Sequence, residues 1–592
     1  MPQPTVSYRL HPADPAAHHF EVSCTVTSPA PQGQRFALPA WIPGSYLVRE
    51  FAKHIVSIRA EAGGKAVRLK KLDKHTWQAA PVKGSEPLTI TMTVYAWDLS
   101  VRGAHLDTTH GFFNGTSVFL RVLGQEDSPC LVHIAPPSGS AYKHWRLATS
   151  LPPARGERGA AKPLGFGLFQ AANYDELIDH PVEMGSFTHF SFEAGGVPHE
   201  VAITGRHDCD TERLAADLAK ICTAQIDFFA RPAPMTRYVF LVTAVGDAYG
   251  GLEHRASTAL ICKRADLPKP GQTTISEGYR RFLGLCSHEY FHTWNVKRIK
   301  PAAFIPYDLE RENYTSLLWA FEGFTSYYDD LFLLRSGVID RASWLELIGE
   351  TLTNVRKTPG RQVQSLSESS FDAWIKYYRQ DENTPNAVVS YYTKGALFGL
   401  ALDLTLRAGG KATLDAVMQA LWQRHGLTGL GVGDEDIRRI AEELSGLSLK
   451  RFFADYADST RELPLERLLA TAGLRLEWIP DPRAKHGVDL GIRTRVENNE
   501  VVLAAVHPGG AAHAAGLSAG DTLVALDGLR ITPATFDALL ARQRPGNTVG
   551  VHAFRRDELL QTTVTLAPPV ADTARLTPAS KPNALRRAWL GS

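Results

Sequence analysis

The chain has 592 residues, 21% of them charged, and a formal net charge of +2. That length is sufficient for three or four domains with separate hydrophobic cores. The near-neutral balance gives no electrostatic basis for binding nucleic acid or an anionic membrane, and no run of eighteen apolar residues predicts a membrane span. Because the first residues lack the basic and apolar regions of a secretion signal, we expect a soluble, cytoplasmic protein.

Residues 1–196 have the pattern of β structure. Short segments at 20–26, 88–96 and 118–123 alternate polar and apolar side chains, and glycine, proline and asparagine turns separate them. The pair Asn114-Gly115 is typical of a two-residue hairpin turn. We therefore expect an N-terminal domain that resembles a β-sandwich.

A dense loop lies inside this β region at residues 41–51. It reads Trp41-Ile-Pro-Gly-Ser-Tyr-Leu-Val-Arg-Glu-Phe, which combines aromatic residues with turn formers. Two interpretations are open. The loop is either a structural turn packed by Trp41 and Tyr46, or a segment that reaches a functional cleft.

The character of the chain changes after residue 196. An amphipathic helix is predicted at 211–230, and a buried strand follows at 237–244. The next segment, Tyr249-Gly-Gly-Leu-Glu-His, is short and contains two glycines. We expect it to be an edge strand that borders a cleft.

A helix predicted over residues 278–294 carries His288, Glu289 and His292 in the spacing H-E-x-x-H. Two imidazoles at positions i and i+4 lie on one helical face, so both can reach one tetrahedral metal ion. Glu289 can then contact a water molecule bound to that ion. The alternative is an ordinary helix with two buried, hydrogen-bonded histidines.

A third ligand is available on the next long apolar segment, which begins at Leu317. Glu322 is the one carboxylate in the apolar run from Leu317 to Ser326. Burying an unpaired carboxylate is costly unless it meets a cation. A metal ion would be that cation, and Glu322 is therefore a candidate ligand.

Three segments resemble the glycyl aminopeptidases, which are zinc peptidases of the gluzincin type. They are His288-Glu-Tyr-Phe-His-Thr-Trp-Asn, Glu312-Asn-Tyr-Thr and Leu318-Trp-Ala-Phe-Glu-Gly-Phe. The resemblance implies one Zn²⁺ per chain, held by His288, His292 and Glu322, with Glu289 as general base. It also implies a mostly α-helical, thermolysin-like catalytic domain over 197–472. The loop at 41–51 resembles the amino-terminal signature of the same family.

Gluzincin aminopeptidases carry a G-x-M-E-N motif, and Gly250-Gly-Leu-Glu-His is similar to it. The resemblance implies that Glu253 binds the free α-amino group of a substrate, with Gly250 and Gly251 at the same site. Leu252 and His254 depart from the family's Met and Asn, which bears on exopeptidase specificity. If Glu253 only lines the cleft, the protein is a zinc endopeptidase; Glu253 as a surface residue in a turn is the further alternative.

A Y-x-K-G element at Tyr392-Thr-Lys-Gly resembles the catalytic tyrosine of the aminopeptidases. A tyrosine hydroxyl can donate a hydrogen bond to the oxyanion of the reaction without supplying charge. The resemblance implies Tyr392 for this role, with the adjacent Tyr391 as the second candidate. Residues 396–470 have a helical pattern that closes the catalytic domain.

The region 473–570 is similar to a PDZ domain of the bacterial protease type. The similarity rests on the strand order and on Ala512-His-Ala-Ala-Gly-Leu-Ser-Ala-Gly-Asp. PDZ domains add an extended peptide to a sheet edge and bind its carboxyl end through backbone amides. The amides at Leu490, Gly491 and Ile492 would provide that site for a peptide, or for an intramolecular segment. The C-terminal tail, 571–592, is expected to fray.

Together these features predict a multidomain α+β protein that hydrolyses the N-terminal peptide bond of peptides with a free N-terminus. The family resemblance implies a preference for a small first residue, Gly or Ala. Three alternatives are open: a zinc endopeptidase, a PDZ peptide-binding scaffold with an inactive peptidase centre, and a gluzincin hydrolase acting on a non-peptide substrate.

Overall fold

The computed structural model describes residues 5–83 and 86–591. They form two compact units. The first takes the chain up to residue 313 together with 328–339 and 418–433, and the second takes 314–327, 340–417 and the chain from 434. Helix α6 (Gly323–Arg335) contributes residues to both units. Within the described residues, no helix combines the length and the hydropathy needed to cross a bilayer.

The first unit starts with a seven-stranded sheet in the order β14-β12-β1-β2-β8-β4-β5. Neighbouring strands are antiparallel except β1 and β12, which are parallel. Side chains of β2 and β8 alternate between buried and half-buried, which is typical of a sheet with one face on the core. The strands are β1 (Val6–Asp14), β2 (His19–Val26), β4 (Ile55–Ala62), β5 (Lys65–Val67), β8 (Leu88–Tyr95), β12 (Cys130–Ile134) and β14 (Gly167–Ala171).

Two four-stranded sheets complete the N-terminal β region. One has the order β13-β15-β10-β9 and the other β11-β3-β7-β6. Their strands are β3 (Arg35–Ala37), β6 (Leu69–Lys71), β7 (Thr76–Ala79), β9 (Ala104–Leu106), β10 (His110–Phe113), β11 (Arg121–Val122), β13 (Arg146–Thr149) and β15 (Val182–Gly185). The expected β-rich N-terminal region is confirmed.

The hairpin turn predicted at Asn114-Gly115 is wrong. Asn114 instead precedes the short helix α1 (Gly115–Val118), and its side-chain amide donates to the carbonyl of Val101. A Cβ atom at Gly115 would lie 2.7 Å from Cα of Ile178, at the end of α2 (Tyr174–Ile178). Gly115 therefore permits close packing of two helices, a tertiary requirement that local turn propensity does not reveal.

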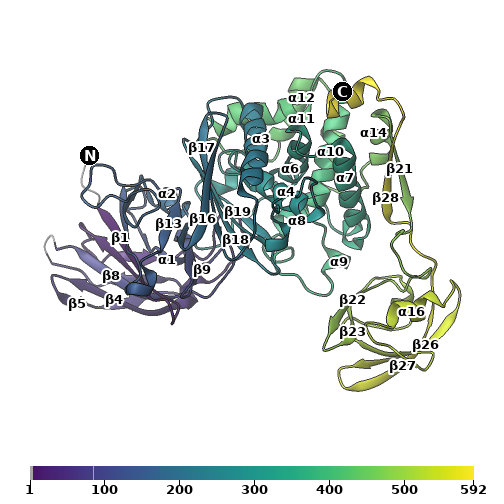
Figure 1. The fold of residues 1–592 in the computed structure, drawn as a ribbon, viewed down its shortest axis with the longest axis horizontal. Helices are drawn as coiled ribbons and strands as arrows, with labels where there is room; N and C mark the ends of the chain where they lie inside the picture. The colour runs from purple at the N-terminus through teal and green to yellow at the C-terminus, as the bar shows by residue number, and fades with distance from the viewer. Residues whose placement is uncertain (1–4, 84–85, 592) are drawn as a thin grey trace. The chain divides into compact units, whose positions relative to one another are not determined.

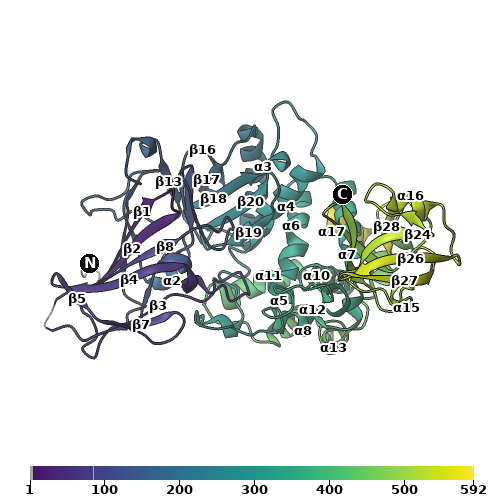
Figure 2. The same ribbon diagram turned by 90° about the horizontal axis from the view of Figure 1, so that it is seen from below.

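A five-stranded sheet follows in the order β16-β17-β18-β20-β19, and Figure 2 shows these strands beside helix α3. Strands β17, β18 and β20 are parallel, while β16 and β19 are antiparallel edge strands. The sheet begins before the boundary expected at residue 197. Its elements are β16 (Phe187–Ala194), β17 (Val197–Thr204), β18 (Tyr238–Val245), β19 (Gly250–Glu253), β20 (Ser257–Lys263), α3 (Thr211–Phe229) and α4 (Glu277–Phe291).

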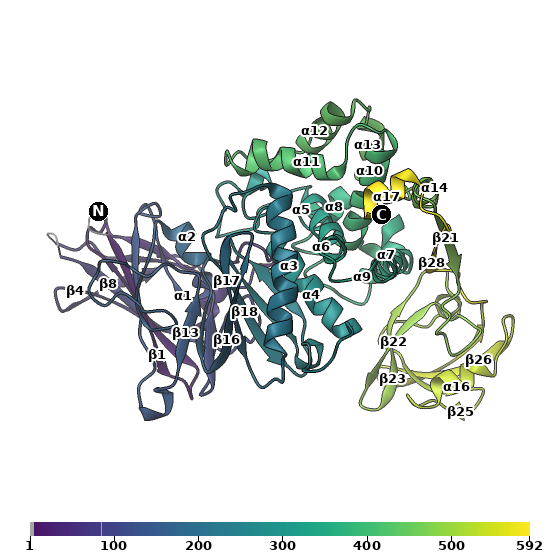
Figure 3. The same cartoon turned by 45° about the horizontal axis from the view of Figure 1, so that its top comes forward.

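Helices α3 and α4 begin where their sequences predict. Side chains of Asp210 and Ser276 accept hydrogen bonds from backbone N–H groups in the first turns of α3 and α4, respectively. The two helices contact each other, and Figure 3 shows α3 running along the sheet. The edge strand expected around residues 249–254 is confirmed as β19.

The second unit is mainly helical, and α10 (Thr393–Ala408) lies at its centre. This helix is almost entirely buried and contacts α5, α7 and α14. Between residues 314 and 472 this unit also has α5 (Leu318–Phe321), α7 (Arg341–Arg356), α8 (Leu366–Phe371), α9 (Thr384–Ala387), α12 (Asp436–Ser445), α13 (Lys450–Tyr456) and α14 (Leu465–Thr471), while α11 (Leu414–Leu421) contributes to both units.

The long helix predicted from Leu317 is interrupted at Glu322. Helix α5 ends at Phe321, and α6 begins at Gly323. A Cβ atom at Gly323 would lie 2.5 Å from Cα of Gly395 on α10. The two backbones can approach this closely because both residues are glycine.

The C-terminal part of the second unit contains the PDZ-like sheet, in the order β22-β23-β24-β26-β27 with β25 paired to β24. Its core includes Leu503, Leu540 and Val551. The elements are β22 (Ile492–Glu497), β23 (Glu500–Val506), β24 (Thr522–Leu526), β25 (Leu529–Arg530), β26 (Thr548–Arg555), β27 (Glu558–Thr565), α15 (Ala511–Ala514) and α16 (Phe536–Ala541).

The C-terminal tail does not fray, contrary to the expectation from its composition. Strand β28 (Thr573–Pro578) pairs antiparallel with β21 (Leu474–Ile479), as Figure 1 shows. Helix α17 (Ala584–Leu590) follows, and Trp589 is 2% exposed and donates a hydrogen bond of 2.9 Å to the Tyr327 hydroxyl. Although the tail is polar in composition, two of its apolar residues, Trp589 and Leu590, are buried.

Candidate active site

Helix α4 carries the H-E-x-x-H residues, and its side chains fix its position within the first unit. The Ser287 hydroxyl donates to the carbonyl of Asp329 at 2.8 Å, and the Gln225 amide donates to the carbonyl of Ser287 at 3.0 Å. Phe291 stacks on Tyr328 of α6 with ring centroids 5.1 Å apart. The helix is therefore held between α3 and the C-terminal half of α6.

The two histidines face each other through their Nε2 atoms, which lie 3.1 Å apart. Each Nδ1 has an acceptor on its outer side: the Asp329 carboxylate at 2.9 Å for His288, and the Asn295 carbonyl at 2.6 Å for His292. Both Nδ1 atoms therefore carry the proton, and both Nε2 atoms present lone pairs.

This donor set fits a divalent metal ion. Two lone pairs at this distance repel each other unless a cation lies between them. Tetrahedral zinc, with Zn–N distances of about 2.0–2.1 Å, would separate the two nitrogens by roughly 3.3 Å. The preorganised tautomers and the separation both match that requirement.

Glu322 lies at the break directly before α6, the helix that carries Asp329. His288, His292 and Glu322 form a group of potential metal ligands whose ligand atoms lie within 4.8 Å of one another. Asp329 was missed in the sequence, although a carboxylate in an apolar helix was the signal that identified Glu322.

The Glu289 carboxylate lies against the edge strand β19. A Cβ atom at Gly251 would be 2.0 Å from Oε1 of Glu289, so only glycine leaves room for the carboxylate here. Ligand atoms of Glu253, Glu289 and His292 also lie within 4.8 Å of one another. The edge strand and helix α4 thus bring two buried carboxylates together beside one of the imidazoles.

The loop at 41–51 reaches the same place. A Cβ atom at Gly44, whose φ is +97°, would lie 2.5 Å from Oε2 of Glu253. Trp41 is fully buried, and its indole donates to the carbonyl of Asp308 at 2.7 Å. Trp41 thus packs the loop, and Gly44 lies next to the Glu253 carboxylate.

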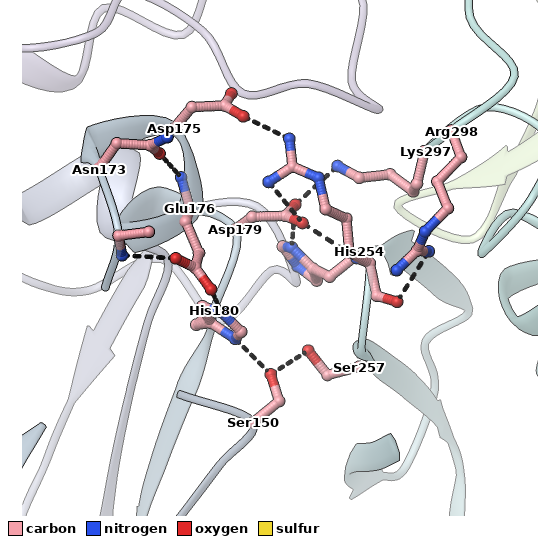
Figure 4. Close-up of polar contacts among 12 residues, drawn as sticks. Ser150, Asn173, Asp175, Glu176, Asp179, His180, His254, Ser257, Lys297 and Arg298 are labelled. Carbon is pink, nitrogen blue, oxygen red and sulfur yellow. Dashed lines mark hydrogen bonds and ion pairs between the residues drawn. The ribbon is translucent and has the colours of Figure 1, made fainter. Parts of the chain in front are cut away.

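His254, the residue after Glu253, points into a buried polar cluster shown in Figure 4. It is 1% exposed, and its Nδ1 lies 3.2 Å from Asp179, which also pairs with Lys297 at 2.7 Å. Burial alone would raise the pKa of Asp179, but Lys297 and Arg255 hold it well below its usual value. His254 thus connects the end of β19 to this buried cluster.

Tyr392 directly precedes α10 and belongs to a cluster of tyrosines in the second unit. Its hydroxyl lies 3.3 Å from that of Tyr378, and its ring stacks on Tyr377. Burial, reinforced by the nearby Glu322 carboxylate, raises the pKa of Tyr392 well above its usual value. The hydroxyl therefore remains a donor at neutral pH. Tyr391 is more deeply buried, with no exposed surface.

The expected peptide-binding loop of the PDZ-like region lies directly before the edge strand β22. Leu490 is buried, and its carbonyl accepts from the N–H of Ala512. The N–H of Gly491 donates to the Asp489 carboxylate at 3.0 Å. One of the amides expected to bind a terminal carboxylate is thus bonded to the chain's own side chain.

Three family models match the chain. The Peptidase M61 N-terminal domain matches residues 7–186, the M61 glycyl aminopeptidase model matches 281–398, and the PDZ domain matches 488–566. These ranges contain the N-terminal sheets, both histidines with Glu322 and Tyr392, and the C-terminal sheet. No curated relative matches the chain.

The chain is also similar to solved structures. A crystal structure of an aminopeptidase N family protein from Idiomarina loihiensis is 42% identical, covers 99% of this chain and 100% of its own, and has a TM-score of 0.94. An M1 zinc metallopeptidase from Deinococcus radiodurans is 14% identical over 78% of this chain and 94% of its own, with a TM-score of 0.48. Legionella pneumophila aminopeptidase A is 13% identical over 97% of this chain and 56% of its own, with a TM-score of 0.49.

Proposed function

The chain belongs to the M61 glycyl aminopeptidase family and is a zinc aminopeptidase, and from this premise we propose the roles of its individual residues and the substrates it selects. His288, His292 and Glu322 hold one zinc ion per chain. The observation that carries this proposal is the pair of Nε2 lone pairs facing each other at 3.1 Å, with both Nδ1 atoms engaged on the outer side.

Asp329 holds His288 in the required tautomer. Its carboxylate accepts the Nδ1 proton at 2.9 Å, which fixes the ring and increases the basicity of the opposite nitrogen. The carbonyl of Asn295 does the same for His292. Bound zinc supplies polarisation of the scissile carbonyl and a lowered pKa for the attacking water.

Glu289 is the general base. Its carboxylate lies against Gly251 of β19 and close to His292. From there it takes a proton from the attacking water and returns it to the leaving amine. Tyr392, which retains its hydroxyl proton, donates a hydrogen bond to the oxyanion of the tetrahedral intermediate.

Glu253 binds the ammonium group at the substrate's N-terminus. The carboxylate is 3% exposed and lies in one cluster with Glu289, so an ammonium bound there places the first peptide bond at the base. Gly44 closes the opposite side of this carboxylate. The first residue of a substrate must therefore fit between a loop and an edge strand, which supports the preference for Gly or Ala.

A panel of aminoacyl anilides tests this function. We expect zinc-restored full-length protein to hydrolyse the glycyl and alanyl anilides fastest, and metal-stripped protein to be inactive. An acetylated alanyl peptide should be cleaved at least about a hundredfold more slowly than the free peptide, because Glu253 then has no cation to bind. Equal cleavage of both peptides would identify an endopeptidase instead.

A second function, peptide binding, belongs to the PDZ region. Strand β22 is an edge strand whose side chains are mostly exposed, so a peptide can extend the sheet there. Leu490, Gly491 and Ile492 lie at the end where its carboxyl group would bind. Fluorescence polarisation with labelled peptides that end in a free carboxylate or an amide measures this binding independently of catalysis.

A further inference from the structure

A cavity of about 340 Å³ lies inside the second unit, and none of the residues assigned to catalysis lines it. Its walls come from α7, α10, the start of α14 with the turn before it, and strand β21. Pockets that bind small organic molecules usually have volumes of about 300–1,000 Å³. This cavity is therefore large enough for a small ligand.

Lys394, the lysine of the Y-x-K-G element, lines this cavity and has no role in the proposed mechanism. It is 2% exposed, and its ammonium donates to the carbonyl of Arg361 at 3.3 Å. Among the described residues, no carboxylate oxygen lies within 4.0 Å of this ammonium. Burial lowers the pKa of Lys394. A buried cation without an ion-pair partner is costly, and such a group usually has a functional reason.

Further positive charge surrounds the cavity. Arg356 lies 5.1 Å from the ring centroid of Trp478 and forms no ion pair with any described residue. Arg361 is paired with Glu462 at 2.9 Å, and Arg467 adds an exposed guanidinium. The lining has four cations and two carboxylates, so it carries excess positive charge.

The rest of the wall is apolar. Leu352 and Leu397 are buried on α7 and α10, and Leu476 and Trp478 face them from β21. The indole N–H of Trp478 donates to Glu466 at 3.0 Å, which fixes the ring. One part of the cavity is therefore cationic, and another offers leucine side chains and an aromatic surface.

We propose that this cavity is a binding site for a small organic carboxylate with a flat or aliphatic body. The carboxylate binds Lys394 and Arg356, and the body packs against Leu352, Leu397 and Trp478. Such a ligand supplies the anion that Lys394 lacks, and it removes apolar surface from water. This site is separate from the zinc centre, so the proposal does not depend on the proposed catalytic roles.

Isothermal titration calorimetry of the metal-stripped full-length protein tests the proposal. Removing the metal prevents a carboxylate from binding to zinc. The probes are benzoate, the uncharged isostere benzamide, and inorganic phosphate, which has charge but no apolar body. We expect benzoate to bind at least about tenfold more tightly than either of the others, which corresponds to about 1.4 kcal/mol.

Amino-acid substitutions test whether benzoate binds in this cavity. We expect Lys394→Met and Arg356→Gln each to weaken benzoate binding at least about tenfold, while Lys411→Met, at an exposed lysine outside the cavity, leaves it unchanged. Lys394→Met should also unfold at a higher temperature than the unliganded parent, because methionine removes an uncompensated buried charge. If Lys394→Met does not fold, Arg356→Gln decides. Benzoate binding that is absent, matched by benzamide, or unchanged in Arg356→Gln overturns the proposal.

Discussion

The two regions for which we propose contacts with opposite ends of a peptide each contain an acidic side chain. At β19 the buried Glu253 carboxylate lies between Gly44 and the cluster of Glu289 and His292. In the PDZ region the Asp489 carboxylate accepts the N–H of Gly491. A carboxylate would therefore favour binding of the peptide end at the first region and oppose binding of the other end at the second.

The difference lies in what each carboxylate would do to an incoming charge. A peptide N-terminus is a cation, so in the proposed role the Glu253 carboxylate would attract it. A peptide C-terminus is an anion, so at the proposed loop the Asp489 carboxylate would repel it and already accepts the Gly491 N–H. We therefore expect substitutions around Glu253 to lower peptide hydrolysis, and substitution of Asp489 to strengthen peptide binding.

Glu289→Gln should have the largest effect and tests whether the region beside β19 performs the chemistry. The amide keeps the shape of the side chain but cannot accept a proton, so kcat should fall by about 10²–10⁴-fold. Steady-state hydrolysis of alanyl anilide measures this loss. Zinc content, measured by atomic absorption, should be unchanged. Activity close to that of the parent would remove Glu289 from the mechanism.

Asp329→Ala should have the next largest effect, because it releases the outer nitrogen of His288. We expect the affinity for zinc to fall by about 10–100-fold, the usual cost of losing a hydrogen-bond partner of a metal-bound histidine. Competition with a chelator of known affinity measures the change. Circular dichroism distinguishes it from unfolding. An unchanged affinity would show that Asp329 does not orient the ligand.

Gly44→Ala tests the contact between the loop and Glu253. The added Cβ would lie 2.5 Å from Oε2, so the carboxylate must shift, and kcat/KM for free peptides should fall about tenfold. Gly64→Ala is the matched control, because Gly64 also has a positive φ, +75°, but open space around its Cβ position. Equal losses in both variants would indicate backbone strain instead of a displaced carboxylate.

Asp489→Asn should have the smallest effect, and in the opposite direction. The substitution removes a negative charge and weakens the bond to the Gly491 N–H, so a peptide with a free carboxyl end should bind up to about tenfold more tightly. The amidated peptide serves as the control and should bind as it does to the parent. If the free carboxylate gains nothing, it does not bind at this loop.

The sequence was most informative where function depends on neighbouring residues. The spacing of His288 and His292 placed both rings on one helical face, and the apolar run around Glu322 identified an isolated carboxylate. The break at Glu322 and the close approach of Gly323 to Gly395 on another helix were not predicted, because the apolar run continues through both sides of the break. Gly44 and Glu253 are more than two hundred residues apart in the sequence. The residues next to each of them do not predict that the two come into contact.

The same limit explains the errors in irregular segments. Asn114-Gly115 has the composition of a hairpin turn, but the glycine is needed for packing against Ile178. The last residues are polar on average, yet Trp589 is buried and bonded to Tyr327. In both cases a single distant contact outweighs local propensity, because burying one large or closely packed group stabilises more than a turn preference does.

The pairing of β21 with β28 has a consequence for how this protein could be rebuilt. Ile479 and Thr573 are directly opposite each other on paired strands, so the whole PDZ region is an insertion into the tip of a β-hairpin. A two-residue turn can join antiparallel strands at such a position. The module could therefore be exchanged, shortened to a turn, or replaced by a foreign binding domain, with both attachment points already fixed on the peptidase.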